Sequence, residues 1–165
     1  MQENEVVISL GTNLGDKLKN LKNALSNIEG FGRILNKSRI FSSDPWGYDS
    51  ENEFLNMGLV IKTSLEPMQL LKKLKSIEKQ MGRRPKMGQS YQDRIIDLDI
   101  LIYSGIIIDN EELSIPHPKI KERKFSLLIL KDLFENEIIP DLNDSPDKML
   151  LKCVDESNVV LLNEK

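Results

Sequence analysis

One segment, residues 93–103, constrains the fold of this chain more than any other, because it combines an aliphatic run with two aspartates. Its β-branched and aliphatic residues, and its end at Ser104-Gly105, are typical of a buried strand. Side chains alternate between the two faces of a strand, so we expect Asp97 and Asp99 to share one face. The same alternation predicts a wholly apolar opposite face made of Ile96, Leu98, Ile100 and Ile102.

Two carboxylates on one half-buried face repel each other, so either one of them takes up a proton or a cation lies between them. Carboxylate oxygens that leave room for water and phosphate are the ligands that suit Mg²⁺. We therefore expect Asp97 and Asp99 to hold magnesium. The alternative is that the two aspartates lie at a solvent-exposed strand end and have no function.

The segment that precedes this strand, residues 83–94, is strongly basic. Arg83, Arg84, Lys86 and Arg94 against Asp93 give it a net charge of +3, whereas the whole chain carries −3. Arginine binds phosphate oxygens in a bidentate manner, and long connections of this kind are often lids. Because the segment leads directly into the strand with the aspartates, we expect the ligand to be a polyphosphate bound with Mg²⁺.

The length of 165 residues suits one domain, residues 1–165. The net charge of −3 disfavours general binding to nucleic acid or to a membrane surface. No apolar run approaches about 20 residues, and the N-terminus lacks the basic and apolar regions of a secretory signal. The only cysteine, Cys153, cannot form an internal disulfide. We therefore expect a cytoplasmic chain that does not span a membrane.

Hydrophobic periodicity predicts strands over residues 6–10, 34–41 and 54–61, and helices over residues 14–30 and 67–82. Ser64 is the expected cap of the second helix. With the aspartate strand, the order is strand, helix, strand, strand, helix, strand, which a ferredoxin-like core requires. Beyond Tyr103 we expect a short strand (106–108), a helix with a break near Phe125 (119–133), a last helix (147–154) and a final strand (159–162).

Several single residues are candidates for ligand contacts. Phe54 and Asn56 share a strand face, which suits a flat heteroaromatic ligand but also occurs at ordinary strand edges. His117, the only histidine, lies between two prolines. It either donates a hydrogen bond to a phosphate, acts as an acid or has a structural role. Glu78 lies near a helix C-terminus, where the helix dipole does not favour a carboxylate, so a function is one explanation for it.

The glycines after the first strand do not form a phosphate loop. Gly11 and Gly15 enclose three residues, and Asp16 follows them. The phosphate-loop motif needs four residues between its glycines and a Lys-Ser/Thr pair after the second. We therefore expect a plain turn from strand to helix.

Taken together, these segments resemble the 6-hydroxymethyl-7,8-dihydropterin pyrophosphokinases of folate biosynthesis, over about residues 6–140. The most specific match is RIIDLDIL at residues 94–101, which fits the family signature R-x-I-D-L-D-I-L. Five further blocks match in the right order: SLGTNLGD (9–16), FLN (54–56), IE with MGR (77–83), IPHP (115–118) and ERKF (122–125).

The resemblance implies an α+β fold, a ferredoxin-like antiparallel sheet with helices packed on its faces in α/β/α layers. It also implies that the enzyme transfers pyrophosphate from ATP to the hydroxymethyl group of the pterin and releases AMP. The expected mechanism is in-line attack with two Mg²⁺ ions, in which the hydroxyl proton goes to Asp97 or leaves because the metal lowers the hydroxyl pKa. The expected partners are these small molecules, without nucleic acid, and the expected state is a monomer.

The resemblance also implies roles for individual residues. Asp97 and Asp99 match the magnesium ligands, and together with Arg83 and Arg94, which match the arginines on the phosphates, they are the expected catalytic residues. The expected ATP contacts are Glu78, Arg83, Arg94, Ile100, His117 and Arg123. The expected pterin contacts are Ser43, Asp44, Trp46, Phe54, Asn56, Tyr91 and Phe125, with the two phenylalanines stacking on the ring. One departure is Tyr91-Gln92-Asp93, which stands where the family commonly has W-G-P.

Two alternatives share the ferredoxin-like topology. A palm-type nucleotidyl transferase also uses paired aspartates but needs a basic template groove, which the net charge of −3 disfavours. An RNA-binding module places aromatic residues on its central strands, whereas residues 6–10 contain none and the aspartate strand ends in Tyr103 alone. Both alternatives predict salt-sensitive binding to oligonucleotides, which the pyrophosphokinase interpretation does not.

Overall fold

The computed structural model describes residues 2–83 and 92–163. These residues form a mixed α+β fold with an antiparallel sheet. The strands are β1 (Asn4–Thr12), β2 (Arg33–Lys37), β3 (Phe41–Ser43), β4 (Phe54–Thr63), β5 (Asp97–Tyr103), β6 (Ile108–Asp109), β7 (Ser114–Ile115) and β8 (Val159–Leu161). The helices are α1 (Lys17–Ile28), α2 (Pro67–Gln80), the 3₁₀ turn η1 (Ile120–Glu122), α3 (Lys124–Phe134) and α4 (Pro146–Lys152).

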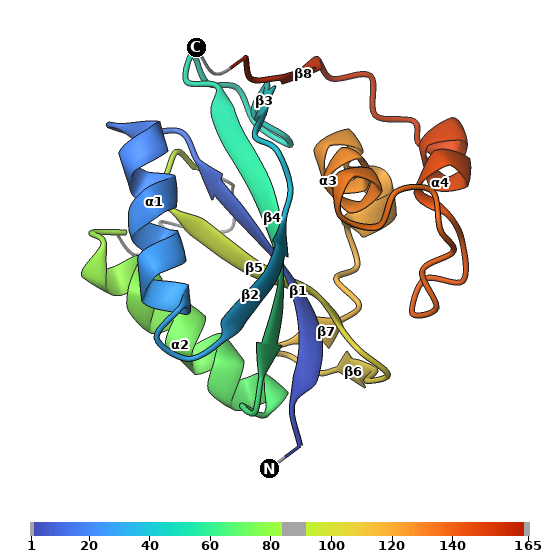
Figure 1. Cartoon of the computed structure of the whole chain (residues 1–165). Helices are drawn as coiled ribbons and strands as arrows, with labels where there is room; N and C mark the ends of the chain where they lie inside the picture. The colour runs from blue at the N-terminus through green and yellow to red at the C-terminus, as the bar shows by residue number, and fades with distance from the viewer. Residues whose placement is uncertain (1, 84–91, 164–165) are drawn as a thin grey trace.

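The main sheet has the strand order β5-β1-β4-β3-β8, and β2 also pairs with β4. Every pairing in it is antiparallel. The helices α1 and α2 cover one face of this sheet, and α3 and α4 cover the other (Figure 1). Each face has its own apolar cluster, which includes Ile8, Leu59 and Leu74 on the first face and Val7, Val60 and Leu130 on the second. Among the described residues, no helix is both long and apolar enough to pass through a membrane.

A glycine in β4 allows α3 to pack directly on the sheet. A Cβ atom at Gly58 would lie 2.2 Å from Cγ2 of Ile129 and 3.1 Å from Cδ1 of Leu133. Atoms of a real side chain do not approach so closely, so a larger residue at position 58 would push α3 away from the sheet. This packing holds the middle and the end of α3 against β4.

The strand predicted over residues 34–41 is interrupted in the structure. It forms two short strands, β2 and β3, which both pair with β4. Between them the chain detours at Ser38, whose backbone N–H donates to Gly58 O at 2.9 Å and whose Oγ accepts from Gly58 N at 2.8 Å. The prediction of one continuous strand was therefore wrong, because a side chain replaces the regular ladder at this point.

The start of α2 also differs from the prediction. The cap is Glu66 rather than Ser64, and the Glu66 N–H donates to Oε1 of Gln69 at 2.9 Å in a capping box. The predicted break in the helix over residues 119–133 is confirmed, because extended backbone at Arg123 separates η1 from α3. The first N–H of α3, at Lys124, donates to Oδ2 of Asp155 at 2.9 Å.

The aspartate strand is shorter than predicted and contains an irregularity. It begins at Asp97, and its pairing with β1 shifts where Val7 pairs with Ile102 and Ile8 pairs with Ile100. The extra residue, Leu101, reverses the alternation beyond it, as a β-bulge does. Ile102 consequently packs in the cluster on the α3 face, and the prediction that it shares a face with Ile96, Leu98 and Ile100 was wrong.

Candidate active site

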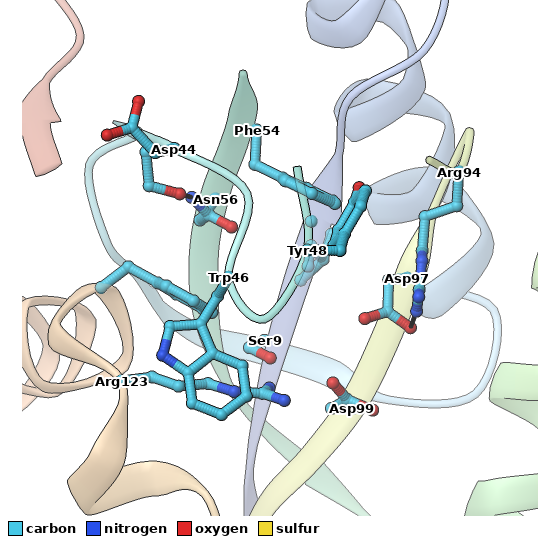
Figure 2. Close-up of a pocket in the computed structure, with 14 residues that line it drawn as sticks. Ser9, Asp44, Trp46, Tyr48, Phe54, Asn56, Arg94, Asp97, Asp99 and Arg123 are labelled. Carbon is cyan, nitrogen blue, oxygen red and sulfur yellow. Dashed lines mark hydrogen bonds and ion pairs between the residues drawn. The ribbon is translucent and has the colours of Figure 1, made fainter. Parts of the chain in front are cut away.

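Two cavities meet at the aspartate strand. The first, which we call the aromatic pocket, is lined by four aromatic side chains, those of Trp46, Tyr48, Phe54 and Phe125. Figure 2 shows the first three of them. The second, which we call the polar groove, extends toward α2, β7 and η1. Arg94, Asp97, Asp99 and Arg123 line both cavities. The two carboxylates predicted to hold magnesium therefore lie at the junction.

The structure brings the residues predicted to contact the pterin into the aromatic pocket. Ser43, Asp44, Trp46, Phe54, Asn56 and Phe125 all line it. They come from the end of β3, the loop of residues 44–53, the start of β4 and the start of α3. Of these elements, β3 and β4 are paired in the sheet. Tyr91 lies outside the described residues, so its predicted contact stays a prediction.

The residues predicted to contact ATP line the polar groove. These are Glu78, Arg83, Arg94, Ile100, His117 and Arg123. Lys75 on α2 and Lys119 beside η1 also line the groove, and sequence reasoning did not single them out. The groove therefore combines several cationic groups with the carboxylates of β5.

Asn56 offers an acceptor, and not a donor, to the aromatic pocket. Its Nδ2 donates to the carbonyl oxygen of Phe41 at 3.2 Å and to Oγ of Ser43 at 2.8 Å, which uses both amide hydrogens. Its Oδ1 faces the neighbouring strand, where a Cβ atom at Gly11 would lie 3.4 Å away. The predicted pairing of donor and acceptor is thus only half present, because only Oδ1, a hydrogen-bond acceptor, is left for a ligand.

Phe54 lies on the same face of β4 as Asn56, as the alternation predicted. A Cβ atom at Gly11 would be 3.6 Å from Cδ1 of Phe54, so the absence of a side chain at Gly11 leaves the ring edge accessible beside β1. Glycine at this position therefore contributes to the floor of the aromatic pocket.

Trp46 connects the two cavities through Arg123. The guanidinium carbon of Arg123 lies 4.6 Å from the centroid of the Trp46 ring and 6.0 Å from that of Phe125. Figure 2 shows the indole of Trp46 in front of the Arg123 side chain. Nζ of Lys119 also lies 5.9 Å from the Trp46 centroid. Cation–π attraction of this kind stabilises the indole over the cationic end of the polar groove.

The carboxylate of Asp97 is paired with two arginines. Nη1 of Arg83 and Nη1 of Arg94 each lie 3.1 Å from its Oδ1. Arg83 also forms a close ion pair with Glu78 on α2, whose Oε2 accepts from the backbone N–H of Leu98 at 2.9 Å. These contacts join α2, the start of the basic segment and β5 at one point.

The crowding of carboxylates shifts their proton affinities. Burial, and then repulsion from Asp97, raises the pKa of Asp99 above its ordinary value. The same two causes, in the same order, raise the pKa of buried Glu78. A carboxylate with a raised pKa binds a proton readily, and a nearby cation would relieve the same repulsion. The carboxylates of the junction therefore favour positive charge beside them, which Arg83 and Arg94 supply at Asp97 in this structure.

The donor set at the junction fits magnesium only together with a second ligand. Within residues 2–83 and 92–163, no group of three or more His, Cys, Asp or Glu side chains is arranged to hold a metal ion. Asp97 and Asp99 supply two carboxylates from one face of β5. Mg²⁺ is commonly bound by one or two carboxylates while water and substrate phosphates complete its shell. The aspartate pair fits this pattern.

His117 is held as a neutral donor at the edge of the polar groove. Its backbone N–H donates to Leu101 O at 2.8 Å, and its Nδ1 accepts from the backbone N–H of Lys119 at 3.1 Å. Burial, and then the charge of Arg123, lowers the pKa of His117 to about 4. Because Nδ1 is an acceptor in the neutral ring, the proton lies on Nε2, which can donate to a ligand.

Sequence reasoning missed Tyr48 and Asn13. Tyr48 lines the aromatic pocket, and Asn13 at the end of β1 donates to the Tyr48 hydroxyl at 3.1 Å. The signal for Tyr48 was its place two residues after Trp46 in a loop already predicted to bind the pterin. No local signal connects Asn13 to this loop, because their contact spans 35 positions in the sequence.

Comparisons with known proteins identify the family. Residues 7–135 match the family model of 7,8-dihydro-6-hydroxymethylpterin-pyrophosphokinase (HPPK). The 2-amino-4-hydroxy-6-hydroxymethyldihydropteridine pyrophosphokinase of Aquifex aeolicus is 36% identical over 135 residues, which are 82% of this chain and 83% of that protein. The enzyme of the same name from Porphyromonas gingivalis is 38% identical over 131 residues, 78% of this chain and 89% of that protein.

Longer proteins also match. The folic acid synthesis protein FOL1 of Dictyostelium discoideum is 37% identical over 156 residues. The aligned region covers 94% of this chain but only 23% of that protein. A crystal structure of Plasmodium falciparum HPPK-DHPS superposes with a TM-score of 0.72 at 19% identity, covering 92% of this chain and 44% of that one. At this identity the superposition shows a shared fold. The family match and the two bacterial relatives carry the conclusion that this chain belongs to the 7,8-dihydro-6-hydroxymethylpterin-pyrophosphokinase family.

Proposed function

We propose that this chain transfers pyrophosphate from ATP to the hydroxymethyl group of 6-hydroxymethyl-7,8-dihydropterin and releases AMP, as a step of folate biosynthesis. The observation that supports this most is the junction of the two cavities at Asp97 and Asp99. Transfer from ATP to a pterin requires that the site of the planar ring and the site of the polyphosphate meet at the reacting atoms. Family membership supports the same activity over the palm-type transferase and the RNA-binding module.

In this proposal the pterin ring lies in the aromatic pocket between Phe54 and Phe125. Stacking on an aromatic side chain suits a planar heteroaromatic ring. Oδ1 of Asn56 accepts a hydrogen bond from an N–H group on the edge of the ring, because its Nδ2 is already used by Phe41 and Ser43. The hydroxymethyl group then extends toward β5, where the two cavities meet.

The phosphates of ATP lie in the polar groove, among Arg83, Arg94, Arg123 and His117. Arg83 and Arg94 exchange the carboxylate of Asp97 for phosphate oxygens when the nucleotide binds, since a guanidinium binds both groups in the same manner. His117 donates from Nε2 as a neutral group and so adds no charge of its own. Glu78 positions Arg83 through their ion pair and contacts β5 by accepting a hydrogen bond from the backbone N–H of Leu98.

Asp97 and Asp99 are the residues that would hold magnesium, and we propose two ions. Bound Mg²⁺ supplies neutralisation of the charge on the phosphate oxygens, which phosphoryl transfer requires. The exchange of the arginines leaves the carboxylate of Asp97 available for this role.

The chemical step in this proposal is in-line attack of the pterin hydroxyl oxygen on the β-phosphorus of ATP, with AMP as the leaving group. The O–P bond to the pterin forms as the bond from the β-phosphorus to the α-phosphate oxygen breaks. Asp97 lies at the junction and can accept the hydroxyl proton. The arginines stabilise the negative charge that moves onto the leaving phosphate oxygen.

We also interpret the sheet as a ferredoxin-like core within one domain. The order β5-β1-β4, with β2 and β3 both on β4, is what the succession strand, helix, strand, strand, helix, strand produces when the second strand is split. This topology places the ends of β1, β4 and β5 side by side, which is where the candidate site lies.

The experiment that tests the function is a product assay with purified protein, MgCl₂, ATP and the reduced hydroxymethyl pterin. We expect AMP and the pterin diphosphate in equal amounts, and no AMP when the pterin or the metal is left out. Formation of ADP in place of AMP would contradict the proposal. Salt-sensitive binding of oligonucleotides without AMP formation would favour the nucleic-acid alternatives.

A further inference from the structure

One carboxylate holds the loop that forms the outer wall of the aromatic pocket. The loop, residues 44–53, carries Trp46 and Tyr48 and connects β3 to β4. Asp93 accepts hydrogen bonds from Tyr48 OH at 2.8 Å, from Ser50 Oγ at 2.9 Å and from Asn52 Nδ2 at 2.8 Å. Three donors from one loop therefore converge on a residue that lies at least 41 positions away in the sequence.

Asn13 connects the same carboxylate to the rigid sheet. Its Nδ2 lies 2.8 Å from Oδ1 of Asp93 and 3.1 Å from the Tyr48 hydroxyl. Its backbone N–H donates to Arg94 O at 3.1 Å, and its Oδ1 accepts from Arg94 N at 2.8 Å. Asn13 is 2% exposed, so this part of the network is fixed in the interior. The loop is thus tied through Asp93 to the end of β1 and to the arginine that pairs with Asp97.

The protonation states suit this arrangement. Burial raises the pKa of Asp93, but the hydrogen bonds from Asn52, Tyr48, Ser50 and Asn13 outweigh it and lower the pKa to about 2. Burial, and then the hydrogen bond to Asp93, raises the pKa of Tyr48 to about 12. Asp93 is therefore an acceptor and the phenol is a donor throughout the neutral range.

The carboxylate of Asp93 is turned toward the loop and away from the nucleotide site. It lines neither the aromatic pocket nor the polar groove among the described residues. Its neighbour Arg94 lines both cavities and pairs with Asp97 at 3.1 Å. The negative charge at position 93 therefore serves the loop, while the adjacent cation serves the site.

We propose that Asp93 is a positioning residue for the pterin site: it holds residues 44–53 against the end of β1 so that Tyr48 forms a fixed wall of the aromatic pocket. The identification of the ligand as a pterin rests on the proposed function, but the positioning of the loop does not. Pre-organised loops bind their ligands more tightly because less conformational entropy is lost on binding.

The positioning can be measured without any ligand, because Trp46 is the only tryptophan and lies in the loop. The substitution Asp93→Ala removes the acceptor of three hydrogen bonds from the loop. Because the loop is then held less firmly, we expect acrylamide to quench the Trp46 fluorescence more efficiently than in the unchanged protein. The matched control is Asp132→Ala. Asp132 also accepts four hydrogen bonds, all from Arg39, and lines neither cavity. Quenching equal to that of the control would overturn the proposal.

The second measurement separates positioning from a general loss of structure. We expect Asp93→Ala to raise the KM for the pterin about tenfold, as the loss of hydrogen bonds to a charged group does, with the KM for ATP changed by less than about twofold. Asp93→Asn keeps one acceptor oxygen and should recover part of the loss. Equal increases in both KM values, or no increase in either, would contradict the proposal.

A variant on the loop side keeps the test valid if Asp93→Ala does not fold. The double variant Ser50→Ala, Asn52→Ala removes two of the donors, the half-buried Ser50 and the exposed Asn52, and leaves the carboxylate in place. We expect it to increase Trp46 quenching and the pterin KM in the same direction and to a smaller extent. No change in both would overturn the proposal. If the unchanged protein forms no AMP, the proposed function fails, whereas the quenching data still decide the role of Asp93.

Discussion

Nη1 of Arg94 lies 3.1 Å from Oδ1 of Asp97, three residues further along the chain, and this ion pair lies where the aromatic pocket and the polar groove meet. Figure 2 shows the arginine side chain directed at the carboxylate, with Asp99 next to it on β5. One short segment therefore places a guanidinium and two carboxylates at the junction, where we propose that they bind phosphate oxygens and a metal ion.

The carboxylates are tested by Asp97→Asn and Asp99→Asn. Each change keeps the shape of the side chain and removes its charge, so we expect Mg²⁺-dependent turnover to fall by about 10³-fold or more while the fold and pterin binding are retained. Turnover and circular dichroism measured on the same samples check this. Full activity in either variant would exclude that residue from metal binding.

Arg94 is tested by Arg94→Ala. Since we place this arginine on the charge that develops during transfer, we expect kcat to fall by about 10²-fold to 10³-fold with little change in pterin affinity. Arg39→Ala is a suitable control, because Arg39 is also paired with an aspartate, Asp132, and lines neither cavity. Equal losses in kcat and in pterin affinity would argue against a role in the chemical step.

The two phenylalanines are tested by Phe54→Ala and Phe125→Ala. Loss of a stacked ring should weaken pterin binding by about tenfold and leave ATP binding unchanged. Titration calorimetry with each ligand gives both values. Phe134→Ala, on the same helix as Phe125 but away from the pocket, serves as the control. Unchanged pterin affinity would remove the tested ring from the site.

The close packing of α3 on the sheet is tested by Gly58→Ala. A Cβ atom would lie 2.2 Å from Cγ2 of Ile129, so we expect the free energy of unfolding to fall by about 1–3 kcal/mol, as overpacking does. Urea denaturation measures it. At Gly105 a Cβ atom meets nothing within 4 Å and only the positive φ of +74° opposes it, so Gly105→Ala separates a steric clash from backbone strain. No loss at Gly58 would show that α3 can shift without a penalty.

The pH dependence of stability reports on His117. Its pKa in the folded protein is about 4, below the ordinary value of 6.5, so between these two pH values the unfolded chain binds a proton that the folded chain does not. The free energy of unfolding therefore falls as the pH drops from about 6.5 to about 4. In His117→Gln this part of the decrease should be absent. Parallel curves for the two proteins, from urea denaturation across this range, would contradict a neutral, half-buried His117.

Local patterns in the sequence were sufficient for the shared face of Asp97 and Asp99 and for the common face of Phe54 and Asn56. These depend only on the alternation of side chains along one strand. The position of Ile102 was not predictable in this way, because the bulge at Leu101 arises from pairing with β1. The break between β2 and β3 likewise depends on the bonds between Ser38 and Gly58, which are remote in sequence.

The candidate site shows the same division. The family motifs identified residues that line the two cavities, although their roles remain predictions, as does the contact of Tyr91. The network around Asp93 was not foreseen, since it joins β1, the loop of residues 44–53 and the segment before β5. In the sequence, Asp93 was only a negative charge in a basic segment. Its hydrogen-bond partners become apparent only when the chain is folded.

The most direct measurement of the central claim follows the phosphorus atoms of ATP into the products. With ATP labelled at both the β- and γ-phosphorus, and with Mg²⁺ and the reduced hydroxymethyl pterin present, we expect both labels on the pterin and none in AMP. Label retained in ADP, or released as free phosphate while the pterin stays unlabelled, would show that the junction at Asp97 and Asp99 does not transfer pyrophosphate to the pterin.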